Sequence, residues 1–425
     1  MEAGSHKGRL HHLALLDLFL LEAWLAKSQF GPFRVPLNVH LSLTALLIGF
    51  LAFAAFSNRQ RWLCSAGLTR SPAVLACLAA LTGWALVSSA LQEEWLLNVA
   101  YCVVWCTNLW VIWLGVPVIL AGWSLRHRLL VILVPLLTCA VLSVAAYPVN
   151  GLDLGRLVGM FFNATHAGRA YSLLALLALF MVILGTSKAR YWLPVMLAAV
   201  VLLVLTRSRT ACVACAVGAL SSILSAIGSP EVGARRIAFR LAAVASVALA
   251  AGVALVYSHV IGVQELMEFA RVPKGVQSLI EARRRYYGYG YSHFWSYGLT
   301  GYGFLSKWGT LEGISTLDEA AELRYGYDMD PHNTFMTVAQ QIGIPGTALF
   351  ALLVLSVWAA ARRQLSPGRS FLIGTLAYCT VLFMNNTWVS FGNPGDRTSL
   401  VSLVALLSWV PRRWRPSGPS LSEQP

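Results

Sequence analysis

Charged residues are scarce in this 425-residue chain, where Asp, Glu, Lys and Arg together make up 12% and hydrophobic residues make up 57%. Soluble globular proteins carry about 25% charged residues, so this composition excludes the surface of an ordinary soluble domain. Strand-like alternation of polar and apolar residues is also lacking, which excludes an outer-membrane barrel. The sequence therefore predicts an all-α integral membrane protein.

Acidic residues are the rarer charged kind, with 18 Asp and Glu against 32 Lys and Arg and a formal net charge of +14. A basic balance is also typical of proteins that bind nucleic acid. In a membrane protein, however, the excess of basic residues is expected in the cytoplasmic loops. We therefore predict membrane lipids, and no nucleic acid, as the surroundings of this chain.

Cysteine patterns that could hold a metal are also lacking. The chain has eight cysteines, most of them inside apolar runs. Cys212 and Cys215 form one CxxC pair without a second pair, and a structural metal site needs more ligands than that. We interpret these cysteines as small apolar side chains and predict no cofactor.

Long apolar runs dominate the chain. A helix needs about 20 residues to cross about 30 Å of hydrocarbon. Twelve apolar segments are candidate spans: 10–27, 37–57, 71–91, 97–122, 129–147, 167–186, 190–206, 210–228, 238–260, 334–361, 369–391 and 397–411. The predicted organisation is nine helices in 1–260, one large loop in 261–333, three helices in 334–411 and a disordered tail in 412–425.

Every second turn between these spans is rich in basic residues. One side of the membrane receives the basic segments 57–70, 124–128, 186–190, 233–236, 361–369 and 412–415. Because cytoplasmic loops carry the excess of Lys and Arg, both termini are predicted in the cytoplasm. The large loop 261–333 then lies outside, which is the periplasmic side if this is a bacterial inner membrane.

Six arginines break this rule, because they fall at the outer ends of spans or in the outer loop. A cation in that position costs insertion energy, up to about 3 kcal/mol toward the bilayer centre. Snorkelling to lipid headgroups explains a single arginine, whereas a cluster is better explained by a bound polyanion such as pyrophosphate. Arginine suits phosphate because its planar fork donates two parallel hydrogen bonds. The six are Arg169, Arg207, Arg209, Arg283, Arg284 and Arg285.

Four stretches resemble one family. They are "GRLVGMFFNATHAGRAYSLLALLAL" (155–179), "LLVLTRSRTACVACAVG" (202–218), "ARRRYYGYGYSHFWSYGLTGYGF" (282–304) and "DPHNTFMTVAQQIGIPGTALF" (330–350). The last, a His-Asn pair that opens a helix, is the most specific. Together they resemble the bacterial O-antigen ligase and polymerase superfamily over roughly 150–390. Thr210 departs from the glycine that usually follows the Ser-Arg turn.

The resemblance implies a GT-C-like glycosyltransferase architecture in the bacterial inner membrane, with a periplasmic active site. It implies transfer of O-antigen from undecaprenyl pyrophosphate to a sugar hydroxyl of lipid A-core. The arginines would stabilise the departing pyrophosphate. His332 would be the general base, since an imidazole has a pKa of about 6.5 when unperturbed. Asn333 is expected to cap the following helix.

Other interpretations stay open. The alternative role for His332 is that of a helix cap or interface anchor, while His166 and His293 are expected to be structural. Asp328 and Asp330 form a candidate metal pair, against our prediction of a metal-independent enzyme. The same scaffold also suits an O-antigen polymerase or a protein O-oligosaccharyltransferase, and a transporter of lipid-linked glycans is the alternative outside this class. The single long outer loop favours the ligase.

Overall fold

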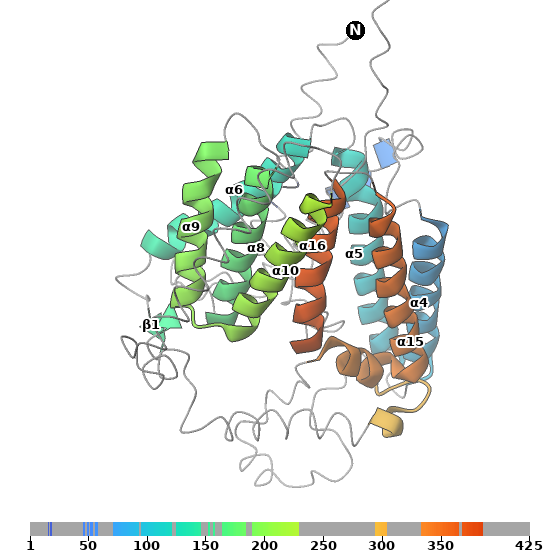
Figure 1. The fold of residues 1–425 in the computed structure, drawn as a ribbon. Helices are drawn as coiled ribbons and strands as arrows, with labels where there is room; N and C mark the ends of the chain where they lie inside the picture. The colour runs from blue at the N-terminus through green and yellow to red at the C-terminus, as the bar shows by residue number, and fades with distance from the viewer. Residues whose placement is uncertain are drawn as a thin grey trace, which may run out of the picture.

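A computed structural model of the chain describes residues 71–92, 95–120, 125–145, 152–153, 156–157, 164–183, 189–228, 294–303, 333–364 and 368–385, with scattered positions between 16 and 57. Eight long helices make up most of these residues (Figure 1). They are α4 (Pro72–Ala90), α5 (Trp95–Leu120), α6 (Leu125–Ala145), α8 (Ala164–Ile183), α9 (Ala189–Leu205), α10 (Arg209–Ile227), α15 (Thr334–Arg362) and α16 (Gly368–Asn385). A short 3₁₀ helix, η3 (Phe294–Tyr297), precedes α15.

One strand pair interrupts this helical architecture. β1 (Leu152–Asp153) pairs antiparallel with β2 (Arg156–Leu157), with Leu152 opposite Leu157. The pair lies in the connection between α6 and α8, where the sequence pattern predicts no strand. Two residues per strand are too few to form a layer, so the described part of the chain remains essentially all-α.

The eight long helices coincide with eight of the twelve predicted spans, with small shifts at their ends. For example, α6 begins at Leu125 and so includes most of the basic turn 124–128. The predicted spans 238–260 and 397–411 and the tail 412–425 lie outside the described residues, and only scattered helical positions are described in 10–27 and 37–57. The count of twelve, the domain boundaries and the GT-C-like architecture therefore stay predictions.

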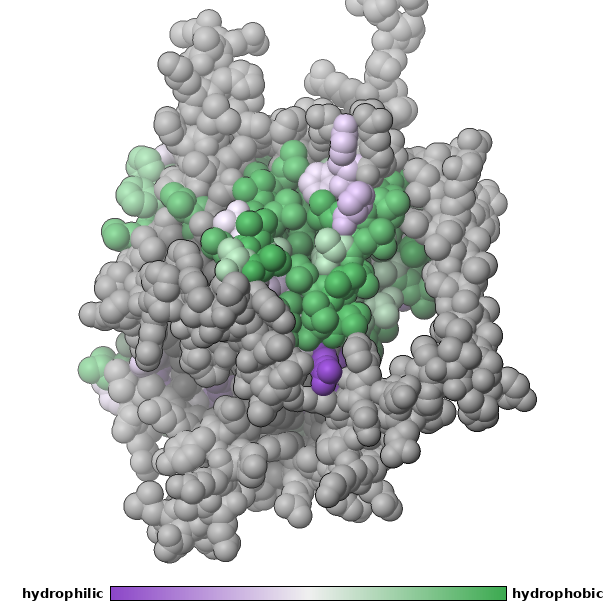
Figure 2. All heavy atoms as spheres, turned by 90° about the vertical axis from the view of Figure 1, so that its left-hand side faces the viewer, coloured by the Kyte–Doolittle hydropathy of each residue, from purple (hydrophilic) through white to green (hydrophobic). Residues whose placement is uncertain are grey.

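The chain is a multi-pass membrane protein. In the described residues, α4, α8, α10 and α15 are long and apolar enough to cross a membrane. The surface of α9 carries large exposed hydrophobic side chains along its length, among them Leu193, Leu197, Val201 and Leu205. Figure 2 shows apolar side chains gathered across the middle of this side of the molecule. A soluble protein rarely exposes such a continuous apolar surface, whereas lipid tails accept it.

Helix α8 forms the centre of the bundle. Every residue from Ala167 to Met181 is buried, and the helix contacts α6, α9, α10 and α16. A helix that is apolar on all sides is expected in such a core position. The start of α8 therefore belongs to the most buried of the described spans.

Small residues allow α10 and α16 to cross closely. A Cβ placed on Gly218 of α10 would lie 2.9 Å from the Tyr378 Cβ and 3.0 Å from the Gly374 carbonyl oxygen of α16. A Cβ on Gly374 would lie 2.7 Å from the Ser222 Cβ. Ser222 Oγ also donates a hydrogen bond to the Ser370 carbonyl oxygen at 3.0 Å. Small residues and hydroxyl bonds of this kind are how membrane helices associate without a hydrophobic driving force.

Candidate active site at one end of the helix bundle

Several helix ends lie at the lower end of the bundle in Figure 1. They are the end of α4, the starts of α8, α10 and α15, and the ends of α9 and α16. In the predicted topology this end faces outward. The starts of α8, α10 and α15 place the positive ends of three helix dipoles at this end of the bundle, which favours a bound anion.

The turn between α9 and α10 holds Arg207 in a rare backbone conformation. Its φ of 51° is the only positive value for a non-glycine residue in the described part of the chain. Such a conformation costs about 1–3 kcal/mol and tends to occur at functional sites. The Thr206 hydroxyl supports the turn, since it donates to the Leu203 carbonyl oxygen at 2.6 Å and accepts from the Ser208 N–H at 3.2 Å. Arg209, which is exposed, then begins α10.

Gly168 brings the start of α8 against this turn. A Cβ on Gly168 would lie 2.5 Å from the Ser208 Cβ and 3.0 Å from the Thr206 hydroxyl oxygen, so only glycine permits this approach. Arg169 follows directly and is buried, with 6% of its surface exposed. The structure therefore brings the backbone at Arg169 next to the turn that carries Arg207 and Arg209, as a shared anion site would require.

Hydroxyl groups from two helices hold the backbone at Arg169. Its carbonyl oxygen accepts hydrogen bonds from Tyr378 of α16 at 3.1 Å and from the Ser172 hydroxyl at 2.9 Å. The two hydroxyls lie 2.9 Å apart and are both buried. This arrangement fixes α16 to α8 one residue after Gly168, so α16 contributes to the placement of the arginine.

The start of α15 is fixed by the residue that follows His332. Asn333 caps the helix, as expected, because its Oδ1 accepts from the N–H groups of Phe335 at 2.9 Å and Met336 at 3.4 Å. Its Nδ2 donates to the Met384 carbonyl oxygen of α16 at 3.5 Å. The backbone next to His332 is therefore anchored to the end of α16, the same helix that holds Arg169.

Helix α15 is broken two turns after its start. Ile342 and Gly343 have non-helical backbone angles, and Gly343 has φ 77° and ψ −178°, a region open essentially to glycine alone. Gly343, Pro345 and Gly346 lie at the break, and residues of these types let a helix bend or pack closely. A Cβ on Gly343 would overlap the Leu299 carbonyl group, so glycine is needed for space as well as for conformation.

The segment 298–303 fills the break and pairs with the backbone groups that it frees. The Tyr302 N–H donates to the Gln340 carbonyl oxygen at 2.7 Å, and the Gly303 N–H donates to that of Gln341 at 3.1 Å. In return, the Ile344 N–H donates to the Gly298 carbonyl oxygen at 3.0 Å. Irregular backbone near a membrane is tolerated where protein satisfies it in this way.

Helix α4 and Gln92 just after it bind both the break in α15 and the segment 298–303. Trp84 Nε1 donates to the Ile342 carbonyl oxygen at 2.8 Å. Ser88 Oγ donates to the Thr300 carbonyl oxygen, and Gln92 Nε2 lies 3.3 Å from that oxygen and 3.2 Å from the Gly301 carbonyl oxygen. Part of the large outer loop is therefore fixed to the helix that begins after His332.

The predicted site residues fall into two groups. The backbone positions of Arg169, Arg207 and Arg209 are brought together, and Asn333 lies at the same end of the bundle. His332 and Arg283, Arg284 and Arg285 lie outside the described residues, as does His293, so their roles stay predictions. His166 is partly buried in the first turn of α8.

Sequence reasoning did not identify the residues that hold this site together: Trp84, Ser88, Gln92, Gly168, Ser172, Thr206 and Tyr378. The available signal was a small or polar residue inside an apolar span. That signal also marks ordinary helix packing, so it does not single out a site.

Two further features bear on the search for ligands. In the part of the chain that the structure describes, no three His, Cys, Asp or Glu side chains gather to hold a metal ion. Asp328 and Asp330 lie outside it, so metal independence stays a prediction.

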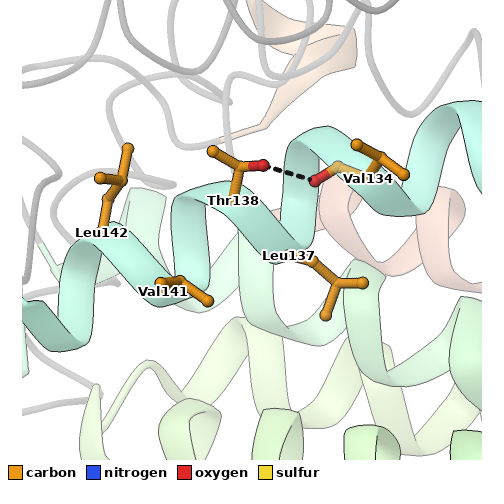
Figure 3. Close-up of a pocket in the computed structure, with 5 residues that line it drawn as sticks. All are labelled: Val134, Leu137, Thr138, Val141 and Leu142. Atoms are coloured by element: carbon orange, nitrogen blue, oxygen red, sulfur yellow. Dashed lines mark hydrogen bonds between the residues drawn. The ribbon is translucent and has the colours of Figure 1, made fainter.

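A recess of about 320 Å³ runs along the middle of α6 (Figure 3). Its described lining residues carry no charge, which suits lipid and not a pyrophosphate: Val134, Leu137, Thr138, Val141 and Leu142.

Fold and site thus define a multi-pass membrane protein with arginines around a helix-start site at one end. The family model described as O-antigen ligase matches residues 194–351, from α9 through the break in α15. The match confirms the resemblance to the O-antigen ligase and polymerase superfamily, whose members are glycosyltransferase-like enzymes acting on lipid-linked glycans. No curated protein matches the chain.

Proposed function

We propose that this protein is an O-antigen ligase of the bacterial inner membrane. It transfers O-antigen from undecaprenyl pyrophosphate to a sugar hydroxyl of lipid A-core on the periplasmic face. The observation that carries the proposal is the close approach of Gly168 to Ser208, because it joins the backbone of Arg169 to the strained turn at Arg207. A cluster of cations beside two helix starts suits a pyrophosphate.

The reaction exchanges one bond at the anomeric carbon for another. The acceptor hydroxyl oxygen forms a bond to this carbon, the bond to the pyrophosphate oxygen breaks, and undecaprenyl pyrophosphate leaves with the bonding electrons. The hydroxyl proton passes to His332. Negative charge grows on the pyrophosphate, where Arg169, Arg207 and Arg209 lower the energy of the transition state, aided by Arg283–Arg285 from the outer loop.

The proposed base, His332, comes directly before the cap of α15. Asn333 uses its side chain to cap α15 and to bind α16, so it holds the backbone beside the imidazole. His332→Ala is expected to lower the transfer rate by about 10²–10⁴ while the protein still folds. Purified protein in lipid, given lipid-linked O-antigen and lipid A-core, measures this. Wild-type rates in the variant would remove His332 from the mechanism.

The same assay separates the alternatives. A ligase modifies lipid A-core, a polymerase extends a second lipid-linked glycan, and a protein transferase modifies Ser or Thr of a protein. Product formation without any ion gradient, in detergent, contradicts a transporter. We favour the ligase because one outer loop, 261–333, dominates the predicted topology, whereas polymerases often have two.

The proposed chemistry needs no divalent metal. Arginines supply the positive charge at this end of the bundle, and Mg²⁺ would prefer two or more carboxylate ligands. Transfer is therefore expected to persist in excess EDTA. Loss of activity that Mg²⁺ or Mn²⁺ restores, matched by loss in Asp328→Asn and Asp330→Asn, would replace this mechanism with a metal-dependent one.

A further inference from the structure

Two adjacent glutamines of α15 bury amide oxygens that nothing in the described structure satisfies. Gln340 and Gln341 expose 4% and 8% of their surfaces. Neither Oε1 atom has a hydrogen-bond partner among the described residues. A buried carbonyl oxygen left in this state costs about 1–3 kcal/mol, and most such groups in native proteins have a partner. Two in succession next to the proposed active site therefore require an explanation.

The glutamines lie in a region that is rich in amides. Their backbone carbonyl oxygens bind the segment 298–303. On the other side of that segment, a Cβ on Gly303 would meet the Asn98 side-chain oxygen and the Gln92 Cγ. Asn98 is itself buried, at 3% exposure. Two amide side chains, Gln92 just after α4 and Asn98 of α5, therefore adjoin the short glycine-containing turn that Gln340 and Gln341 bind through their backbone carbonyl oxygens.

We propose that Gln340 and Gln341 form a subsite for a sugar of the acceptor glycan, an inference that rests on the proposed transferase function. An unsatisfied carbonyl oxygen needs a donor, and sugar hydroxyls and N-acetyl N–H groups are donors. A phosphate offers only acceptor oxygens at neutral pH, so these atoms disfavour the pyrophosphate of the donor substrate. A polyhydroxylated ring is the ligand class that suits amides and apolar walls together.

The position of the pair assigns it to the acceptor. The arginines of the donor site lie on α8 and the α9–α10 turn, whereas the glutamines lie on α15, which contacts α4 and α16. Gln340 lies six residues past Thr334, where α15 begins, and these residues rise about 9 Å along the helix away from the end that follows the proposed base His332. That is beyond direct hydrogen-bond reach, so the pair would bind a sugar remote from the reacting hydroxyl.

Remote binding makes a specific kinetic prediction. Interactions that are equal in the ground and transition states change KM and leave kcat unaltered. Gln340→Met and Gln341→Met, which keep the side-chain length, should each raise the acceptor KM about 3- to 10-fold, as loss of one hydrogen bond implies. The double variant should raise it further.

The experiment uses the full-length protein in lipid, with lipid A-core and a short alkyl glycoside of the accepting sugar as two acceptors. We expect the variants to differ from wild type with lipid A-core and to match it with the short glycoside, which does not reach the pair. Gln364→Met is the matched control, because Gln364 lies past the other end of α15 and bonds its Ala360 carbonyl oxygen. Thermal unfolding checks that each variant folds.

The outcomes are distinguishable. An unchanged acceptor KM with a raised unfolding temperature would mean that the two amide oxygens are unsatisfied or bind water. That result overturns the proposal of an acceptor subsite. A large fall in kcat with both acceptors also overturns it, since it would indicate disruption of the active site. If wild type fails with lipid A-core and instead extends a lipid-linked glycan, the ligase proposal fails. The glutamine variants are then measured with that glycan, and its KM decides the subsite.

Discussion

Replacement of Gly168 by alanine tests whether the contact between α8 and the α9–α10 turn builds the donor site. The new Cβ would lie 2.5 Å from the Ser208 Cβ, whereas ordinary contact begins at 3.4 Å. The two elements must therefore separate by about 0.9 Å at this point. Because Ser208 lies between Arg207 and Arg209, and Arg169 follows Gly168, this separation changes the spacing of the three arginines.

Two effects follow from that separation. Overpacking of this size typically destabilises a protein by about 1–3 kcal/mol, against a gain of about 0.5–1 kcal/mol from replacing glycine with alanine in a helix. A displacement of about 1 Å in a positioned group can lower a rate about 100-fold. We therefore expect a modest fall in unfolding temperature and a large fall in transfer at saturating donor.

Removal of the opposing Cβ should reverse both effects. Ser208→Gly frees the space, and glycine is tolerated at a helix N-cap at a cost of a few tenths of a kcal/mol. The double variant Gly168→Ala/Ser208→Gly should recover most of the activity, which a double-mutant cycle measures. Gly83→Ala in α4 is the control, since its Cβ would meet nothing within 4 Å. Wild-type transfer by Gly168→Ala, or no recovery in the double variant, refutes the reasoning.

Three further predictions concern strain and positioning. Arg207→Gly should relieve the positive φ and raise stability by about 1–2 kcal/mol while lowering transfer about 10²–10³-fold; lower stability in thermal unfolding would contradict the strain argument. Gly343→Ala should prevent folding of the α15 break, because the Cβ overlaps Leu299; normal yield and unfolding temperature in detergent would mean that the break is not needed. Tyr378→Phe should cost about 0.6 kcal/mol, the average for a hydrogen bond between membrane helices, because the bond from the Tyr378 hydroxyl to the Arg169 carbonyl oxygen is lost; an unchanged unfolding temperature would show that Ser172 alone holds the Arg169 carbonyl.

Hydropathy predicted the helices well because each span is a continuous run of apolar residues. The ends were less certain, since interfacial residues extend a helix beyond its apolar part. The first turn of α6 illustrates this, because the helix includes the basic residues Arg126, His127 and Arg128. The strand pair of β1 and β2 had no sequence signal, because two residues are too few for a period to appear.

The candidate arginines could be selected from the sequence, whereas the residues that hold their backbone in place could not. Arginines on the outer side violate a strong rule, so Arg169, Arg207 and Arg209 were conspicuous in the sequence. Gly168 and Tyr378 violate no rule, and their roles depend on which helices become neighbours. Helix α15 and the segment 298–303 are joined by backbone hydrogen bonds, which the identity of the side chains does not predict.

The broken helix also has a consequence for how the protein is made. The carbonyl oxygens of Gln340, Gln341 and Ile342 depend on donors outside α15, including Trp84 from a helix synthesised about 250 residues earlier. An unsatisfied backbone group in hydrocarbon costs several kcal/mol, so the bent form of α15 is stable only once those donors are in place. We therefore expect α15, the helix that follows the proposed base, to reach its bent conformation late in biogenesis. An incomplete chain would then be unable to act on lipid-linked sugars.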